Sequence, residues 1–106
     1  MRLSERDRET VVRVTAEAAG PGARVLLFGS RTRDDLRGGD IDLLVELPTV
    51  SPNRLALGDR IGARLQRIMG LRRIDVLVAD PATPDSPVLR AARRDGIELS
   101  AAERAA

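Results

Sequence analysis

The sequence contains no cysteine, histidine, tryptophan or tyrosine, and only one phenylalanine. Without cysteine, disulfide bonds and thiolate metal sites are impossible, and without histidine there is no imidazole ligand or imidazole general base. A single aromatic ring also largely excludes stacking on nucleic-acid bases. Any catalysis must therefore use carboxylates, hydroxyl groups and arginines, and the core must be built from Leu, Ile, Val and Ala.

Long apolar runs are missing as well. No segment approaches the roughly 18 consecutive apolar residues that a membrane-spanning helix needs, and the N-terminus lacks an apolar signal stretch. We therefore expect a cytoplasmic protein without a membrane partner. All 18 basic residues are arginines, balanced by 16 acids to a formal charge of +2, and no basic tail stands out. Direct nucleic-acid binding is not expected.

The chain has 106 residues, which is the size of one ordinary domain. We predict a single domain over residues 1–106, with a core from about residue 5 to 99 and a polar, Ala-rich tail over 100–106.

The first half of the chain predicts one helix and two strands. Ser4, with Asp7 three residues later, is typical of a helix start, and Gly20-Pro21 ends that helix. The segment from Arg24 to Phe28, with its continuous apolar run Val25-Leu26-Leu27-Phe28, predicts a buried strand. A second strand over 40–47 alternates between an apolar face and a face that carries Asp40 and Asp42.

The second half predicts two helices separated by a strand. Ser51-Pro52 suggests a cap and a first-turn proline for a helix whose apolar stripe runs to Gly70 and consists of Leu57, Ile61, Leu65 and Ile68. Residues 73–79 predict a third strand, interrupted by Asp75. Ser86-Pro87 begins a last helix through Asp95, followed by Gly96 at its end and a short extended piece over 97–99.

The predicted order is α-β-β-α-β-α, which indicates an α/β (α+β) fold with a small mixed sheet flanked by helices. Asp40 and Asp42 project from one face of their strand, and Asp75 joins them if the second and third strands are neighbours. Burying unpaired carboxylates costs several kcal/mol each, and a divalent cation removes this cost. With oxygen ligands only, the natural ion is Mg²⁺ or Mn²⁺, and a pair of such ions is suited to phosphoryl transfer.

Gly29-Ser30 follows the first strand directly. A glycine at this point lets backbone N–H groups approach an anion, the serine adds a hydroxyl, and Arg31 is near enough in sequence to pair with negative oxygens. Together with a metal that prefers phosphate ligands, these residues favour a nucleoside triphosphate.

The arrangement of Gly29-Ser30, a spacer, Asp40-Ile41-Asp42-Leu43 and a later strand acid, Asp75, resembles the polymerase-beta-like nucleotidyltransferase superfamily. Within it the chain is most similar to the minimal nucleotidyltransferases, or MNT proteins. The resemblance implies that Gly29 and Ser30 hold the triphosphate of ATP. It also implies that Asp40 and Asp42 bind two Mg²⁺ ions and that Asp75 completes the catalytic metal site and helps to take the proton of the acceptor.

The resemblance implies a partner too. Many MNT proteins are antitoxins of HEPN-domain toxin RNases and, in studied cases, move AMP from ATP onto a toxin tyrosine. The chain would then act as a protein adenylyltransferase within a toxin–antitoxin hetero-oligomer.

Other interpretations remain open at this point. Asp40 and Asp42 on their own are more often a solvated strand face, and Gly29-Ser30 on its own is more often a turn. An antitoxin that neutralises its partner by contact alone, or a domain that senses nucleotide without turnover, would carry the same residues.

Overall fold

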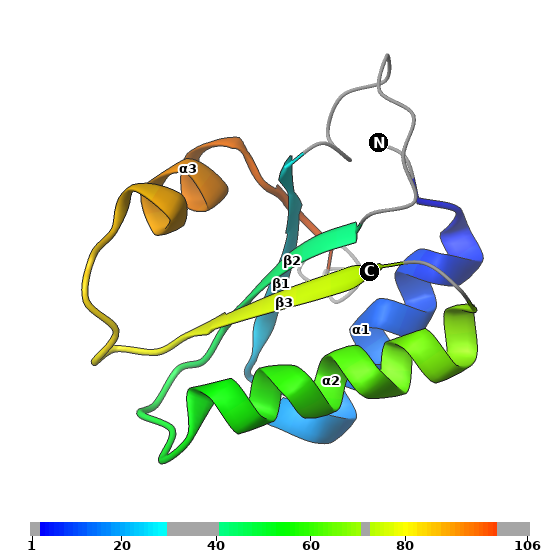
Figure 1. The fold of residues 1–106 in the computed structure, drawn as a ribbon, viewed down its shortest axis with the longest axis horizontal. Helices are drawn as coiled ribbons and strands as arrows, with labels where there is room; N and C mark the ends of the chain where they lie inside the picture. Colours follow the sequence, from blue (N-terminus) through cyan, green and yellow to red (C-terminus); the bar gives the residue numbers. More distant parts are fainter. Residues whose placement is uncertain (1–2, 30–40, 71–72, 100–106) are drawn as a thin grey trace.

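The computed structural model describes residues 3–29, 41–70 and 73–99. This part of the chain forms three helices and a four-stranded mixed sheet with the strand order β3-β2-β1-β4 (Figure 1). The helices are α1 (Glu5–Ala19), α2 (Arg54–Met69) and α3 (Pro87–Asp95), and the strands are β1 (Arg24–Phe28), β2 (Ile41–Glu46), β3 (Ile74–Ala79) and β4 (Ile97–Glu98).

The sheet confirms the predicted fold class and element order. β1 pairs antiparallel with both β2 and β4, whereas β2 and β3 are parallel. The parallel pair is possible because α2 carries the chain back across the sheet between the two strands. The extended piece predicted after the last helix is β4, which pairs with β1.

Both faces of the sheet are covered (Figure 1). On the face covered by α1 and α2, the alternate strand residues Leu27, Leu43 and Val45 pack against Val14 and Ile61. On the opposite face, a smaller cluster joins Leu26, Leu44 and Ala79 to Leu89 and Ala92 of α3. α3 packs against Ala79 at the end of β3, whereas Asp75, near the start of this strand, is exposed.

Two of the three helix starts follow the prediction. The backbone N–H of Asp7 donates to Ser4 Oγ at 3.1 Å, and the N–H of Leu89 donates to Ser86 Oγ at 3.2 Å. Pro87 is the first residue of α3, where its missing N–H costs nothing.

The predicted start of α2 is wrong. Asn53, not Ser51, caps this helix, and its side-chain oxygen accepts the N–H of Ala56 at 3.0 Å. Ser51 is held elsewhere, because its N–H donates to Asp80 Oδ2 at 2.8 Å. A contact with a residue that follows β3 thus moves the helix start beyond Pro52.

The apolar stripe of α2 is also shorter than predicted. Ile61 and Leu65 are fully buried, but Ile68 is 50% exposed. The last turn of α2 instead directs Met69 toward the core. No helix in the described ranges is sufficiently long and apolar to cross a membrane.

Candidate active site

Asp42 and Asp75 lie side by side. They are direct partners in the parallel register of β2 and β3, so both side chains project from the same face of the sheet. Leu44 and Leu77, two residues further along each strand, lie in the cluster under α3. Asp42 is half-buried, whereas the Asp75 side chain is 57% exposed. Neighbouring strands are about 4.8 Å apart, which brings the two carboxylates close together.

Gly29 lies next to this pair. The register of β1 with β2 places Phe28 opposite Asp42, and Gly29 follows with a φ of +75°. A Cβ atom at position 29 would be 2.5 Å from Asp42 Oδ2. The backbone of Gly29 therefore lies directly against the Asp42 carboxylate, which only a glycine allows. Three neighbouring strands thus place Gly29, Asp42 and Asp75 in a row at one end of the sheet.

The charge of Asp75 is partly balanced within its own strand segment. Arg73 Nε lies 3.5 Å from Asp75 Oδ2, and both side chains are more than half exposed. An exposed ion pair of this kind contributes little to stability. Asp75 therefore remains accessible to a divalent cation, which would attract its carboxylate more strongly than Arg73 does.

The other predicted site residues, Ser30, Arg31 and Asp40, lie outside the described residues. Within the ranges that the structure describes, no group of three or more His, Cys, Asp or Glu residues is placed to hold a metal ion. The roles assigned to these residues from the sequence remain predictions.

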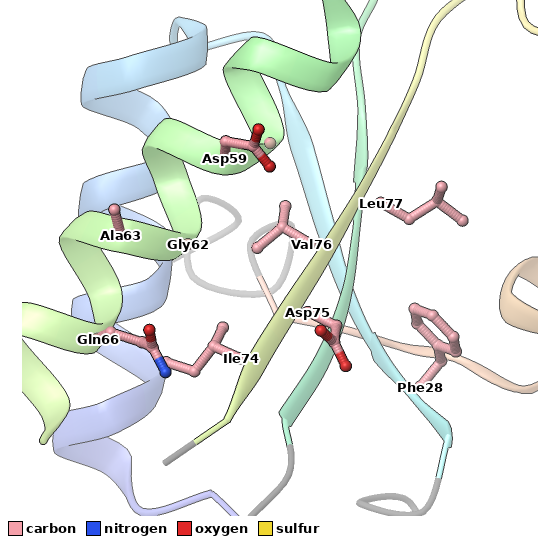
Figure 2. A pocket seen from close by; sticks show the side chains of 10 residues that line it. Phe28, Asp59, Gly62, Ala63, Gln66, Ile74, Asp75, Val76 and Leu77 are labelled. Atoms are coloured by element: carbon pink, nitrogen blue, oxygen red, sulfur yellow. The ribbon is translucent and has the colours of Figure 1, made fainter. Parts of the chain in front are cut away.

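A cavity of about 420 Å³ adjoins Asp75 (Figure 2). Phe28, Asp75 and Leu77 border it from the strands, and five residues of α2 border it from the helix. These helix residues, which the sequence reasoning did not identify as part of a site, are Gly58, Asp59, Gly62, Ala63 and Gln66. The two glycines four residues apart in a helix were the available signal, because glycine in a helix interior is costly unless something needs the space.

The side chains present suit a divalent metal. Asp42 and Asp75 supply carboxylate oxygens from one face, and two like charges in register repel each other unless a cation lies between them. Such a donor set matches Mg²⁺ or Mn²⁺, which prefer oxygen ligands.

The chain matches a protein family described as the nucleotidyltransferase domain over residues 9–95. This match spans most of the sequence, and the chain belongs to this family. No curated protein matches the sequence significantly.

Solved structures with the same fold come from toxin–antitoxin complexes. One chain is from the tri-AMPylated HEPN toxin of Shewanella oneidensis in complex with an MNT antitoxin, with 15% identity, a TM-score of 0.63, and 97% of this chain and 77% of that chain covered. A toxin–antitoxin complex with AMP-PNP gives 17% identity, a TM-score of 0.63, and coverage of 87% and 71%. The MntA–HepT complex gives 14% identity, a TM-score of 0.60, and coverage of 95% and 76%. The chain thus has the minimal fold of polymerase-beta-like nucleotidyltransferases.

Proposed function

We propose that this nucleotidyltransferase is an MNT-type antitoxin that transfers AMP from ATP to a tyrosine hydroxyl of a HEPN toxin RNase, in a reaction that depends on Mg²⁺. The observation that carries the proposal is the pairing of Asp42 with Asp75 in adjacent strands, with Gly29 against Asp42. The fold shared with chains of toxin–antitoxin complexes, one of them tri-AMPylated and one with AMP-PNP, supports this partner and this substrate.

The proposed reaction forms one bond and breaks one. The acceptor oxygen bonds to the α-phosphorus of ATP, the bond from this phosphorus to the α,β-bridging oxygen breaks, and pyrophosphate leaves with the electron pair. The hydroxyl proton passes to the Asp75 carboxylate, which is exposed and can release it to solvent. Mg²⁺ held by Asp42 and Asp75, with Asp40, would supply positive charge to the phosphate oxygens.

The test is to mix the protein with ATP labelled at the α-phosphate, Mg²⁺ and the protein encoded by the neighbouring reading frame, which the proposal expects to be a HEPN protein. We expect the wild type to label the partner, and Asp42→Ala to lose about 100-fold or more of this activity. Chelation of Mg²⁺ by EDTA should abolish labelling. Asp85→Ala is the matched control, because Asp85 is an exposed acid, 60% accessible, that pairs with Arg90 before α3.

Equal labelling by the wild type and a folded Asp42→Ala variant would contradict the site. Neutralisation of the toxin is measured in parallel with the Asp40→Ala, Asp42→Ala double variant. Full neutralisation by this variant would favour an antitoxin that acts by contact alone.

A further inference from the structure

A groove runs along β3, one of the two edge strands of the sheet in the described ranges. It consists of two cavities, of about 420 and 500 Å³, which share Asp59, Val76 and Leu77 as lining residues. We call these two cavities together the β3 groove. Asp75 lines the first cavity, and Thr83 lines the second. Each cavity falls within the size range of ligand pockets.

The groove follows the edge of β3: α2 lines one side of it, and Asp75 and Leu77, which project from the other face of the sheet, also line it. Gly58 and Gly62 bring α2 close to β3, and a Cβ atom at position 58 would be 3.0 Å from the Val76 carbonyl oxygen. The missing side chains at these two positions let α2 pack closely on β3, and Asp59, the residue after Gly58, is exposed and lines both cavities. Figure 2 shows Asp59 on α2 and Asp75 on β3 around the same cavity.

Asp59 is an acid that forms no ion pair with another residue in the described part of the chain. Nearly every acidic side chain in the described ranges has an ion pair or another interaction, and the exceptions there are Asp59 and Glu9. Arg54, which also lines the β3 groove, is paired with Asp80 at 3.1 Å. The charge of Asp59 is therefore available to a cation from outside the chain.

The geometry of the proposed transfer places the acceptor on the β3 side of the site. Gly29, Asp42 and Asp75 follow the strand order β1, β2, β3, so a triphosphate held near Gly29 has its leaving group on the β1 side. In-line transfer requires the acceptor oxygen to approach the phosphorus from the opposite side. That side is β3, where the groove begins at Asp75.

From these observations we propose that the β3 groove binds an extended, positively charged segment of the acceptor protein and that Asp59 determines this specificity by pairing with a basic residue near the acceptor hydroxyl. The inference rests on the proposed nucleotidyl transfer. It adds the chemistry of the acceptor segment and a residue that recognises it. Asp59 contacts the acceptor segment and takes no part in the chemical step.

The experiment uses two fluorescein-labelled synthetic peptides with a central tyrosine, one flanked by arginines and one by glutamates. Fluorescence anisotropy measures their binding to the full chain with Mg²⁺ and an ATP analogue that cannot be cleaved at the α,β bond. The variants are Asp59→Arg and Glu9→Arg, which change the net charge equally at two exposed acids that form no ion pair within the described residues.

We expect the arginine peptide to bind more tightly than the glutamate peptide. Asp59→Arg should weaken binding of the arginine peptide about tenfold or more, whereas Glu9→Arg should change it less than about twofold. Failure of the arginine peptide to bind, equal binding of both peptides, or equal effects of the two substitutions would overturn the proposal.

A separate readout distinguishes this failure from failure of the proposed function. Thermal stabilisation by Mg²⁺ and ATP, together with AMP transfer to the HEPN protein, tests the nucleotidyl transfer itself. If the wild type transfers AMP while the peptides show no dependence on Asp59, the acceptor inference alone is wrong. If the wild type transfers no AMP to the HEPN protein, the proposed function is wrong.

Discussion

Gly29 is subject to two separate constraints. Its φ of +75° lies in the left-handed region, which costs other residues roughly 1–2 kcal/mol, and a Cβ atom there would collide with the Asp42 carboxylate. Gly20 has the first constraint without the second, since its φ is +98° and nothing lies within 4 Å of the Cβ position. A substitution of Gly20 can therefore serve as the control for a substitution of Gly29.

Gly29→Ala should lower the free energy of unfolding by at least about 1 kcal/mol and should also displace the Asp42 carboxylate. It should therefore lose the thermal stabilisation that we expect Mg²⁺ and ATP to give to the wild type. Gly20→Ala should show a similar loss of stability from its backbone strain but retain the response to Mg²⁺ and ATP. Urea unfolding and thermal shift measure the two effects. A Gly29→Ala variant that still responds to Mg²⁺ and ATP would argue against a nucleotide site at Asp42.

Individual residues also show how much of the candidate site the sequence alone could predict. Asp42 and Asp75 could be identified from the sequence because their strands could be, and the alternation of side chains gives the face of each within its own strand. That the two share a face depends on the pairing of β2 with β3. Asp59 could not be identified, because a lone acid on a helix has the same local pattern whether it faces solvent or borders a groove. Its environment depends on where α2 lies against β3.

At the scale of helices and strands, the close contact between α2 and β3 depends on Gly58 and Gly62. An alanine at position 62 would meet Val76 Cγ2 at 3.6 Å and the Ile74 carbonyl oxygen at 3.7 Å, which are ordinary contacts. An alanine at position 58 would lie 3.0 Å from the Val76 carbonyl oxygen and 3.3 Å from Val78 Cγ2. The backbone oxygen at position 76 cannot easily move, because it belongs to a paired strand.

Gly62→Ala should therefore raise the free energy of unfolding by about 0.5–1 kcal/mol, which is the gain in helix propensity. Gly58→Ala gains the same propensity, but the close contact offsets it, so this variant should be no more stable than the wild type. Urea unfolding monitored by circular dichroism at 222 nm, a wavelength that reports helix, compares the two. Equal stabilisation by both substitutions would show that α2 is not held against β3 as described.

The start of α2 shows how one element depends on another. Ser51-Pro52 and Asn53 are both reasonable caps by local rules. Asn53 takes the role because Asp80, at the end of β3, binds the N–H of Ser51. A pattern within the helix could not distinguish the two, because the deciding contact comes from a residue far away in the sequence.

At the scale of the whole molecule, Asp80 links the segment before α2 to the turn that follows β3. Its carboxylate accepts the N–H groups of Ser51 and Ala82, each at 2.8 Å, and a hydrogen bond from Arg54 at 3.1 Å. The side chain is fully buried. The N–H of Ser51 is the largest cause that lowers the pKa of Asp80, from 3.8 to about 2, with further contributions from Ala82 and Arg54.

This pKa predicts how stability depends on pH. A carboxyl group whose pKa is lower in the folded than in the unfolded state stabilises the fold above its unfolded pKa, and this contribution is lost as the pH falls through its folded pKa. The wild type should therefore lose the contribution of Asp80 between about pH 4 and pH 2. Asp80→Asn should be less stable at neutral pH and should lose less stability across that range.

Urea unfolding at a series of pH values measures the difference between the two proteins. Glu9→Gln is the control, since Glu9 is an exposed acid on α1, outside the hydrogen bonds of Asp80. A wild type and an Asp80→Asn variant with parallel pH profiles would exclude this role of Asp80.

The sequence by itself determined the type and order of the helices and strands, the absence of thiol and imidazole chemistry, and the face shared by Asp42 and its strand neighbours. These follow from local periodicity and from the residue types present. The tertiary structure alone decided that Asp75 lies beside Asp42, that Asn53 caps α2, and that Asp59 borders a groove. Each of these depends on contacts between segments distant in the chain, which no local pattern specifies.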